Sequence, residues 1–542
     1  MEEKTTAFLQ DEYNRRIEEL REKEYPALKG VTYLDHGGST IPAKSLLDEV
    51  AADLSSNLYG NPHSACTPAE LSGRRVDEIR EQALRFFNAD PEHFDLVFVA
   101  NATAAMKLVM DAFKDHCDGS RSLSRSQRRK FWYGYHRDAH NSLIGIREAA
   151  SGGHHCFDTD AAVDAWIAGA APATNARQHL RLFAYPGQSN MTGRRLPPTW
   201  PSLIRASPHT STTFTLLDAA ALATTSPLPL HDPTTAPDFT TLSFYKIFGF
   251  PDLGALLIRR TPATAALLTS RRYFAGGTVD MVTAHPPQHA RKPALHSALE
   301  DGTLPFHNIV ALGAALTTHT RLFLSMSAVS AHTAALTARL HAGMAALRHA
   351  SGAPLVAVYN EPGARFGNPA AQGATVAFNV RDPAGAFVAP GAVERAADAR
   401  GVFLRSGSLC NPGGAARYLG WGAAELWGLY EEGLRCSRPA GVVGGRPTGV
   451  VRVSLGAGST VGDVDAFLGF LREVCADRVV GEEESLVKGE AEAESVGEET
   501  VSAGRSVVEG KRGSGERRRG MRRLIMSCFT GGGGEYEGEK RG

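Results

Sequence analysis

The chain alternates short, largely apolar runs with segments in which apolar residues recur at intervals of three or four. Short apolar runs without charged residues predict buried strands, and they occur at residues 31–34, 96–99, 182–185, 214–217, 239–244 and 255–258. Between them, helical spacing predicts amphipathic helices, for example around Val76, Ile79 and Ala83. Strands that alternate with helices predict an α/β fold built on a largely parallel, doubly wound sheet.

The pattern changes along the chain and suggests how it is organised. Residues 8–22 predict an amphipathic helix, and the polar, basic residues 115–130 predict a surface loop. An alanine-rich helical region follows residue 311, and strand character returns at residues 375–378. We therefore expect four parts: an N-terminal helical extension at 1–30, a large domain at 31–310, a smaller C-terminal α/β domain at 311–476 and a tail at 477–542.

Composition narrows the functional classes. The formal net charge is zero, which gives no general electrostatic attraction to nucleic acid or to a membrane surface. No apolar run reaches the length of a membrane span, and the charged N-terminus does not resemble a secretory signal. The seven cysteines are scattered without a CxxC pair, which argues against a zinc site and favours the reducing cytoplasm. The acidic, basic and glycine-rich blocks of the tail predict disorder.

Two of the predicted strands end at a charged residue. Asp218 closes the run at 214–217, and Lys246 follows the run at 239–244. A buried carboxylate or ammonium group is costly unless something pairs with it. Pyridoxal phosphate (PLP) would use both, because its aldehyde bonds to a lysine amine and its ring nitrogen needs a carboxylate to stay protonated. A structural salt bridge between the two strand ends would explain the same residues.

Other polar residues at strand ends suit such a cofactor. The strand at 96–99 leads into Asn101, Ala102 and Thr103 at the start of a helix, where backbone amides and a hydroxyl could hold phosphate. An ordinary helix cap is the alternative explanation. His140 lies in a polar turn before another helix, where its ring could lie over a flat cofactor or serve a structural role.

A cysteine in the smaller domain has an unusual setting. Cys410 is preceded by Gly407 and followed by Asn411 and Pro412, which predicts a mobile loop. Arg405 nearby is expected to favour the reactive thiolate form. Most cysteines are inert packing residues, which is the alternative explanation for Cys410.

Short strings occur in one order over residues 33–470: YLDHGGST, NLYGNPHS, NATAAMKL, DAHNSLIGIRE, LFAYPGQSNMTG, LLDAAAL, LSFYKIFGFPDLGALLIRR, YFAGGTVD, LEDGTLPF, LRSGSLCNPGGAARYLG and VRVSLGAGSTVGDVDAFL. Together they resemble the class V aminotransferase-like, PLP-dependent cysteine desulfurases, and within them the N-terminal domain of the molybdenum cofactor sulfurases. The resemblance implies the type I fold of PLP-dependent transferases, PLP as cofactor and a homodimer.

The resemblance implies a role in cofactor binding for several residues. Lys246 matches the lysine that bonds to PLP, Asp218 the partner of the ring nitrogen, and His140 the imidazole that stacks on the ring. Asn190 matches a residue near the ring hydroxyl. The remaining matches concern the phosphate group, either in the same chain or, for the last of them, in the partner subunit: Ala102, Thr103, Ser243 and Thr278.

The resemblance also implies an activity. Cys410 matches the cysteine that takes sulfur from L-cysteine as a persulfide while alanine is released, and Arg405 and Arg452 match residues that bind the substrate carboxylate. The implied sulfur acceptor is the molybdenum cofactor or a protein that carries it. Two departures are visible. The family often has three cysteines in the Cys410 loop, and full sulfurases continue into a molybdopterin-binding domain where this sequence has its tail.

Two other functions stay open from the sequence. Another class V PLP enzyme, such as an amino acid lyase or an aminotransferase, would not need Cys410. A catalytically silent paralogue that acts as an assembly partner would need none of these residues, although Lys246, Asp218, His140 and Cys410 are all present.

Overall fold

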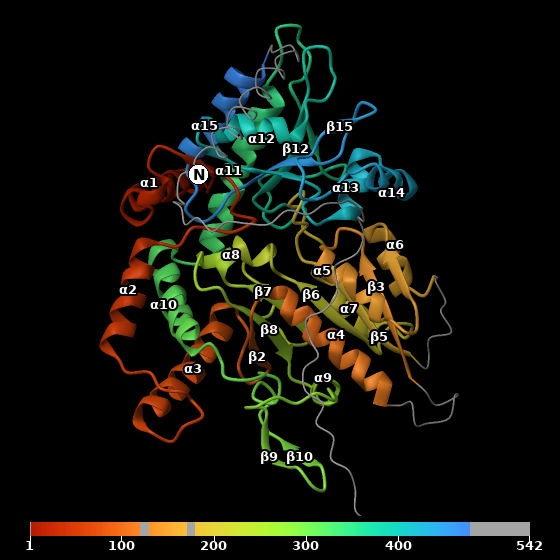
Figure 1. Ribbon diagram of the computed structural model, residues 1–542. Helices are drawn as coiled ribbons and strands as arrows, with labels where there is room; N and C mark the ends of the chain where they lie inside the picture. Colours follow the sequence, from red (N-terminus) through yellow and green to blue (C-terminus); the bar gives the residue numbers. More distant parts are fainter. Residues whose placement is uncertain (1, 120–128, 171–178, 477–542) are drawn as a thin grey trace, which may run out of the picture. The chain divides into compact units, whose positions relative to one another are not determined.

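The larger of two main sheets has seven strands (Figure 1). The computed structural model describes residues 2–119, 129–170 and 179–476, with side chains in the first helix from residue 12 on. The strands lie side by side in the order β2 (Phe94–Val99), β8 (Gly254–Arg259), β7 (Phe239–Ser243), β6 (Thr213–Asp218), β5 (His179–Pro186), β3 (Lys130–His136) and β4 (His154–Phe157). β8 runs antiparallel to both neighbours, and the other neighbouring pairs are parallel. The predicted largely parallel sheet is confirmed.

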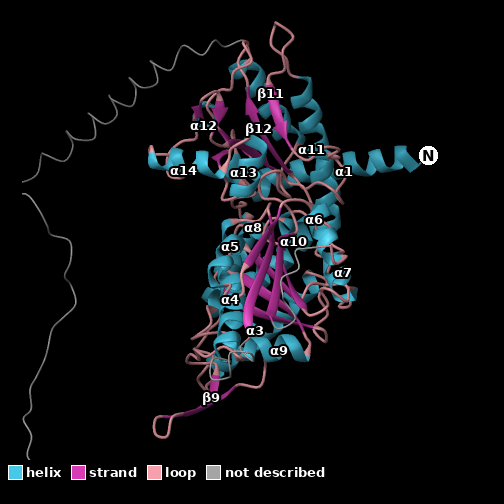
Figure 2. Ribbon diagram, turned by 90° about the vertical axis from the view of Figure 1, so that its right-hand side faces the viewer, coloured by secondary structure: helices cyan, strands magenta, loops and turns pink. Residues whose placement is uncertain are grey.

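Helices cover both faces of this sheet (Figure 2). Successive strand residues point to opposite faces, so Leu96 packs in one core and Val97 in the other. One face is covered by α4 (Ala102–Gly119), α5 (Asn141–Ile144) and α9 (Pro262–Thr269). The other is covered by α2 (Lys44–Ser56), α3 (Thr67–Phe86), α6 (Asp160–Ile167), α7 (Trp200–Ala206) and α10 (Phe306–Phe323). Burial on both faces explains why the strands are largely apolar.

The predicted surface loop at 115–130 is wrong at its beginning. α4 continues to Gly119, because Cys117 is buried and extends the apolar face of the helix. Lys114 and Asp118 pair across one turn at 3.4 Å, which further supports the helix. β3 begins at Lys130, and residues 120–128 lie outside the described part of the chain.

The second main sheet has four antiparallel strands, in the order β11 (Val356–Tyr359), β12 (Thr375–Val380), β17 (Val450–Ser454) and β14 (Arg405–Gly407). Its core is closed by α11 (Met326–Ala346), α12 (Pro390–Asp398) and α15 (Val461–Phe470). The first strand of the chain, β1 (Thr32–Tyr33), pairs with β13 (Val402–Phe403), so the N-terminal segment lies beside this part of the molecule. The predicted strand at 375–378 is present within β12.

The remaining elements are short or peripheral. They are α1 (Glu2–Glu24), α8 (Tyr245–Phe248), α13 (Pro412–Leu419), α14 (Ala423–Glu431), the hairpin β9 (Val279–Thr283) and β10 (Gln288–Arg291), and the pair β15 (Val442–Val443) and β16 (Arg446–Pro447). Short 3₁₀ turns occupy Pro26–Leu28, Gly145–Ala149 and Leu222–Thr224, and a π turn occupies Leu471–Cys475.

The connection between the two sheets bears on the expected domain boundary at residue 311. That residue lies inside α10, whose buried residues Ile309, Leu312 and Leu316 pack in the core of the large sheet. The helical region breaks instead at Leu324, which has a left-handed backbone (φ 66°) between α10 and α11. All described residues belong to one compact unit by their contacts.

Among the described residues no single helix is both long and apolar enough to cross a membrane. The bent pair α10–α11, with 58° between its two helices, meets the criteria of length and composition when the two helices are taken together.

Candidate active site

A pocket lies where the carboxyl ends of the large sheet's strands face β14 and β17 of the smaller sheet. Side chains at the ends of parallel strands meet at one edge of a sheet, which is where α/β proteins bind ligands. The pocket brings together every site residue predicted from the sequence except Thr278: Lys246, Asp218, His140, Asn190, Ala102, Thr103, Ser243, Arg405, Arg452 and Cys410.

Asp218 and Lys246 lie at the carboxyl ends of two neighbouring parallel strands, β6 and β7. Asp218 is the last residue of β6 and is buried, and its Oδ1 accepts a hydrogen bond from the backbone N–H of Ala220 at 3.0 Å. Lys246 lies in α8, directly after β7. Among the described residues no ion pair joins Lys246 to Asp218, so a structural salt bridge between strand ends does not account for them.

Burial shifts the protonation of both groups. It raises the pKa of Asp218, an effect that the Ala220 hydrogen bond and the charges of His140 and Lys246 oppose. It lowers the pKa of Lys246, with Arg452 and Arg405 acting in the same direction and Asp218 against it. A lysine with a lowered pKa supplies more of the neutral amine, which is the form that attacks an aldehyde carbon or takes up a proton.

His140 is held in one orientation at the pocket wall. It caps the N-terminus of α5, and its Nδ1 accepts the backbone N–H of Ser142 at 3.1 Å. Because Nδ1 accepts, the proton of the neutral ring belongs on Nε2. Burial lowers the pKa of His140, which favours that neutral form. A flat, neutral ring of this kind can stack on a planar cofactor.

Hydroxyl groups surround the start of α4. The backbone N–H of Ala102 donates to Ser243 Oγ at 2.9 Å, which joins the helix start to the end of β7. The hydroxyls of Thr103 and Ser142 are hydrogen-bonded to each other at 2.8 Å. A helix N-terminus surrounded by hydroxyl groups suits a phosphate group.

The two arginines differ in how they are held. Arg452 on β17 is buried, and its guanidinium pairs with the Asp35 carboxylate and donates to the backbone oxygen of Asn190 at 3.1 Å. Arg405 lies opposite Arg452 in the register of β14 and β17. Its exposed side chain has no hydrogen-bond or ion-pair partner among the described residues. Of the two arginines, Arg405 is therefore the one whose guanidinium is left unpaired among the described residues.

Cys410 is half-buried and lines the pocket just before α13. Its backbone is left-handed, with φ of 54°, as is that of Leu409 before it, with φ of 57°. The carbonyl of Cys410 accepts the backbone N–H of Asn141, next to His140, at 2.9 Å. This hydrogen bond connects the backbone at Cys410 to the start of α5. The sequence predicted a mobile loop and gave no sign of such a contact.

Thr278 lies apart from this pocket. It is fully buried, and its hydroxyl donates to the carbonyl of Ala275 at 2.8 Å and accepts that residue's N–H at 3.0 Å. Within one chain it does not meet the other site residues, so its role toward a partner subunit stays a prediction.

Three residues of the site were missed by sequence reasoning about function. Asp35 pairs with Arg452, the buried Gln188 lines the pocket, and the fully buried Asn411 caps α13 behind Cys410. Each lies within or beside a short polar string that follows a strand, which is the signal that points to them.

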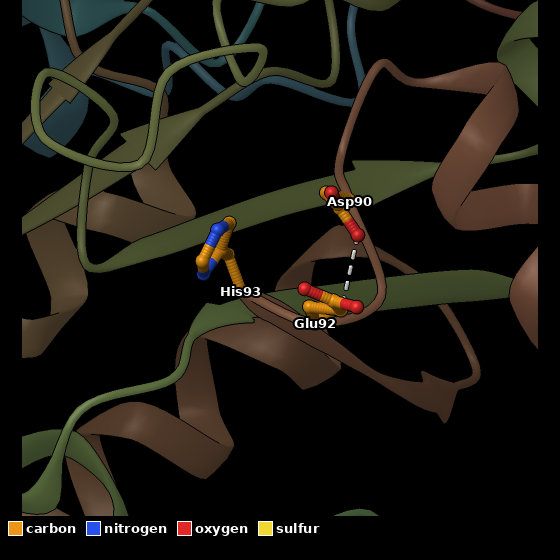
Figure 3. Close-up of side chains that lie close together, drawn as sticks. All are labelled: Asp90, Glu92 and His93. Carbon is orange, nitrogen blue, oxygen red and sulfur yellow. Dashed lines mark hydrogen bonds between the residues drawn. The ribbon is translucent and has the colours of Figure 1, made fainter.

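A separate polar cluster lies on the surface turn before β2 (Figure 3). Asp90, Glu92 and His93 place their potential metal-ligand atoms within 4.8 Å of one another, and all three are exposed. The backbone N–H of Glu92 donates to Asp90 Oδ1 at 2.9 Å. These residues precede β2, whereas the pocket lies beyond its carboxyl end, so the cluster takes no part in the pocket.

Comparison with known proteins places this geometry in a family. Residues 32–467 match the family model described as Aminotransferase class-V. The chain belongs to this family. The molybdenum cofactor sulfurase of Aspergillus oryzae is 53% identical over 463 residues, which are 85% of this chain and 54% of that protein. The chain therefore spans about half the length of the curated relatives it matches.

Solved structures share the fold of this chain. The apo cysteine desulfurase of Thermococcus onnurineus NA1 superimposes with a TM-score of 0.63 at 19% identity, covering 84% of this chain and 98% of that one. A variant of the protein C-DES with glycine covalently linked to its PLP cofactor has a TM-score of 0.59 at 16% identity, covering 84% and 99%. The predicted α/β fold of the type I PLP-dependent transferases is confirmed.

Proposed function

We propose that this chain is a PLP-dependent cysteine desulfurase that takes sulfur from L-cysteine, holds it as a persulfide on Cys410 and releases alanine. One observation carries the proposal: Cys410 lines the same pocket as Lys246 and Asp218. A lyase or an aminotransferase needs an amine and a carboxylate of this kind, but it does not need a thiol beside them.

The pocket fits PLP group by group. Lys246 would bond to the aldehyde carbon, Asp218 would pair with the ring nitrogen, and His140 would lie over the ring. The start of α4, with Thr103 and Ser243, would hold the phosphate. When bound, PLP withdraws electrons from the substrate's α-carbon and makes its proton removable. C-DES, which has this fold, carries PLP.

The chain's own residues supply the remaining steps. Arg405 holds the substrate carboxylate, and the neutral amine of Lys246 accepts and returns the α-proton. The Cys410 thiolate attacks the substrate sulfur, so that a sulfur–sulfur bond forms as the carbon–sulfur bond breaks. The electron pair of the broken bond passes to the substrate carbon, which is protonated to give alanine. Cys410 is left as a persulfide, a reversible state of cysteine.

We propose the molybdenum cofactor, or a protein that carries it, as the sulfur acceptor. The relatives that are about 50% identical to this chain bear the name molybdenum cofactor sulfurase, and the family model matches residues 32–467, which include the pocket residues. We also propose a homodimer, in which the buried Thr278 turn faces the phosphate of the partner subunit. Thiol chemistry of this kind requires a compartment that keeps cysteine reduced, such as the cytoplasm.

The domain organisation is a further proposal. We propose an N-terminal extension at 1–30, a PLP-binding large domain that begins at residue 31 and a small domain that ends at residue 476. We place the change from large to small domain at the break after α10 rather than at residue 311. The predicted disordered tail at 477–542 lies outside the described residues.

The test of cofactor binding uses the purified protein with PLP. We expect a yellow protein with an absorption band near the visible edge. Borohydride should abolish this band and leave the reduced cofactor covalently attached to Lys246. Lys246→Ala should lose the covalently attached cofactor, whereas Lys107→Ala, at an exposed lysine that does not line the pocket, should keep it. A wild-type protein that binds no PLP at saturating cofactor contradicts the proposal.

The test of sulfur transfer uses L-cysteine as substrate. Wild-type protein should release alanine and carry a persulfide on Cys410, read by mass spectrometry. Cys410→Ser should bind PLP but lose most of its alanine production, because a hydroxyl is a far weaker nucleophile toward sulfur. Cys436→Ser, at an exposed cysteine, is the matched control and should behave as wild type. Undiminished turnover of Cys410→Ser would favour a lyase-type enzyme, and absence of turnover with PLP bound would favour a silent paralogue.

A further inference from the structure

The backbone around Cys410 is strained. Leu409 and Cys410 follow each other with φ of 57° and 54°. Residues with a Cβ atom rarely adopt this left-handed region, because the side chain crowds the following carbonyl oxygen. Two such residues in succession persist where surrounding contacts fix them, and such strain gathers at functional sites. In this segment, side-chain hydrogen bonds and apolar packing hold the backbone.

Two asparagine side chains supply the first set of contacts. Asn190 Nδ2 donates to the carbonyl of Leu409 at 2.7 Å. Asn411 Nδ2 donates to Asn190 Oδ1 at 3.0 Å and to the carbonyl of Asp138 at 3.1 Å. Asn190 follows β5 and Asp138 follows β3, so both anchors belong to the large sheet. The amide pair therefore bridges the large sheet and the Cys410 segment.

Burial makes these bonds consequential. Asn411 is fully buried, so water cannot replace a lost partner without a rearrangement. The Leu409 side chain is also buried and packs with Met191 and Trp421 in a small apolar cluster. The packing of the Leu409 side chain holds the segment before Cys410. The hydrogen bonds of Asn190 and Asn411 hold the backbone before and after Cys410, whose side chain lines the pocket.

We propose that Asn190 and Asn411 form an amide latch that positions Cys410 in the pocket during sulfur abstraction, and that opening of this latch releases the loop for delivery of the sulfur. This inference rests on the function proposed above. The strained backbone at Leu409 and Cys410 relaxes once the latch opens, so release is favoured after the bonds break. Asn190 and Asn411 are positioning residues, because they act through Cys410.

The sharpest variant is Asn411→Ser. The side-chain oxygen of Asn411 accepts the backbone N–H of Gly414 at 2.9 Å as the N-cap of α13, and serine preserves such a cap. The substitution therefore removes the two bonds from Nδ2 and adds no charge. Asn368→Ser is the matched control, because the Asn368 side-chain oxygen accepts the N–H of Ala370 at 2.9 Å outside the pocket.

The first readout is alkylation of the protein without added cofactor by iodoacetamide, followed peptide by peptide. Asn411→Ser should raise the rate at Cys410 about fivefold or more, whereas Asn368→Ser should leave it unchanged. The exposed Cys66 and Cys436 serve as internal references within each sample. The second readout is kinetic: kcat for alanine formation should fall about tenfold, with KM for L-cysteine and the PLP absorption band unchanged.

A thermal melt will show whether Asn411→Ser folds. If it does not fold, a second variant tests the same proposal. Asn190→Ser removes the bond to Leu409 and should produce the same change in alkylation. The double variant should change the rate no more than the larger single effect, because both residues serve one latch. Rates at Cys410 within twofold of wild type in folded variants, or fully additive effects, overturn the latch. A wild-type protein that makes no alanine refutes the proposed function, and the alkylation rates still decide the latch.

Discussion

Arg452 shows how one residue pair shapes the pocket. Its guanidinium is 2% exposed and is paired with the Asp35 carboxylate. Burial lowers the pKa of Arg452, and the charge and hydrogen bond of Asp35 oppose that shift. A buried cation without a partner is strongly unfavourable. Asp35 therefore stabilises the buried positive charge of Arg452 in the pocket, while Arg405 has no ion-pair partner among the described residues.

Asp35→Asn should reveal this dependence. The variant keeps the side-chain shape but leaves the buried guanidinium without its counter-charge, so we expect a loss of about 2 kcal/mol in the free energy of unfolding. Thermal melting would measure it. Asp48→Asn breaks an exposed pair with Lys44 and should leave the melting temperature almost unchanged, because solvent screens such a pair. Equal melting temperatures for the two variants would show that Arg452 does not depend on Asp35.

At the scale of elements, α8 positions Lys246 by a close contact. This helix ends at Gly249, which has φ of 78°. A Cβ atom there would lie 2.2 Å from the backbone nitrogen of Pro42 and 2.5 Å from the carbonyl carbon of Ile41. Glycine is needed both for the left-handed backbone and for this approach. The segment after β1 thus fixes where the lysine helix can sit.

Gly249→Ala should displace α8, lower stability and weaken PLP retention. Gly385→Ala is a matched control, because Gly385 has φ of 88° with no heavy atom within 4 Å of its added Cβ. The control should cost about 1 kcal/mol for the left-handed backbone alone. The additional clash at Gly249 should cost roughly 1–3 kcal/mol more. Melting temperature and PLP content would measure the difference, and equal effects of the two variants would exclude a role for the contact.

α10 contributes a buried histidine that makes stability depend on pH. Neither ring nitrogen of His319 has a hydrogen-bond partner in the described structure, and the ring lies among Phe86, Phe248 and Phe323. Burial lowers the pKa of His319 to about 4. Below pH 6.5 the unfolded chain takes up a proton there, whereas the folded chain does so only below about pH 4. Stability is therefore lost as pH falls through this window.

His319→Phe should remove this part of the acid sensitivity. Between pH 6.5 and pH 4 the wild-type protein should lose about 3 kcal/mol more than the variant in its free energy of unfolding. Above pH 7 the two stability curves should run parallel. Urea unfolding at a series of pH values measures the difference. Parallel curves over the whole range would show that His319 is not the group responsible.

At the scale of the whole molecule, the pocket needs both sheets. Asp218 and Lys246 follow strands of the seven-stranded sheet, whereas Arg405 and Arg452 lie on the four-stranded sheet and Cys410 follows it. A change in how the two sheets meet would alter the distance between the thiol and the cofactor site. All of these residues fall within 2–476, the part of the chain that the structure describes with two gaps.

Removal of residues 477–542 should therefore leave folding and PLP binding intact. The described residues contain the pocket and its supporting cores, and the composition of the tail is too polar to build another core. Truncation after residue 460 is the contrasting variant, because it also removes α15 with its buried Val464 and Phe467. The shorter protein should melt well below wild type. A large drop in melting temperature for the first truncation alone would contradict the expectation.

The sequence by itself determined the strands, their alternation with helices and the residue types at strand ends. These are local patterns, because a strand buried on both faces must be apolar and a chemical group at its end interrupts the run. Asp218, Lys246, His140 and Cys410 could be named in this way. The convergence of Asp218, Lys246 and His140 follows from the parallel arrangement, which places the carboxyl ends of the strands at one edge. Cys410 reaches the same pocket from the four-stranded sheet.

The tertiary structure decided which side chains hold one another. Among the described residues, Lys246 and Asp218 form no ion pair, and Arg405 has no ion-pair partner. Asp35 and Arg452, which are 417 positions apart in the sequence, form one. The tertiary structure also joined Asn190 to Asn411 across 221 positions and so fixed a loop that its glycine and proline predicted to be mobile. Hydrogen bonds between such distant residues depend on how the two sheets pack, and local sequence patterns carry no information about that packing.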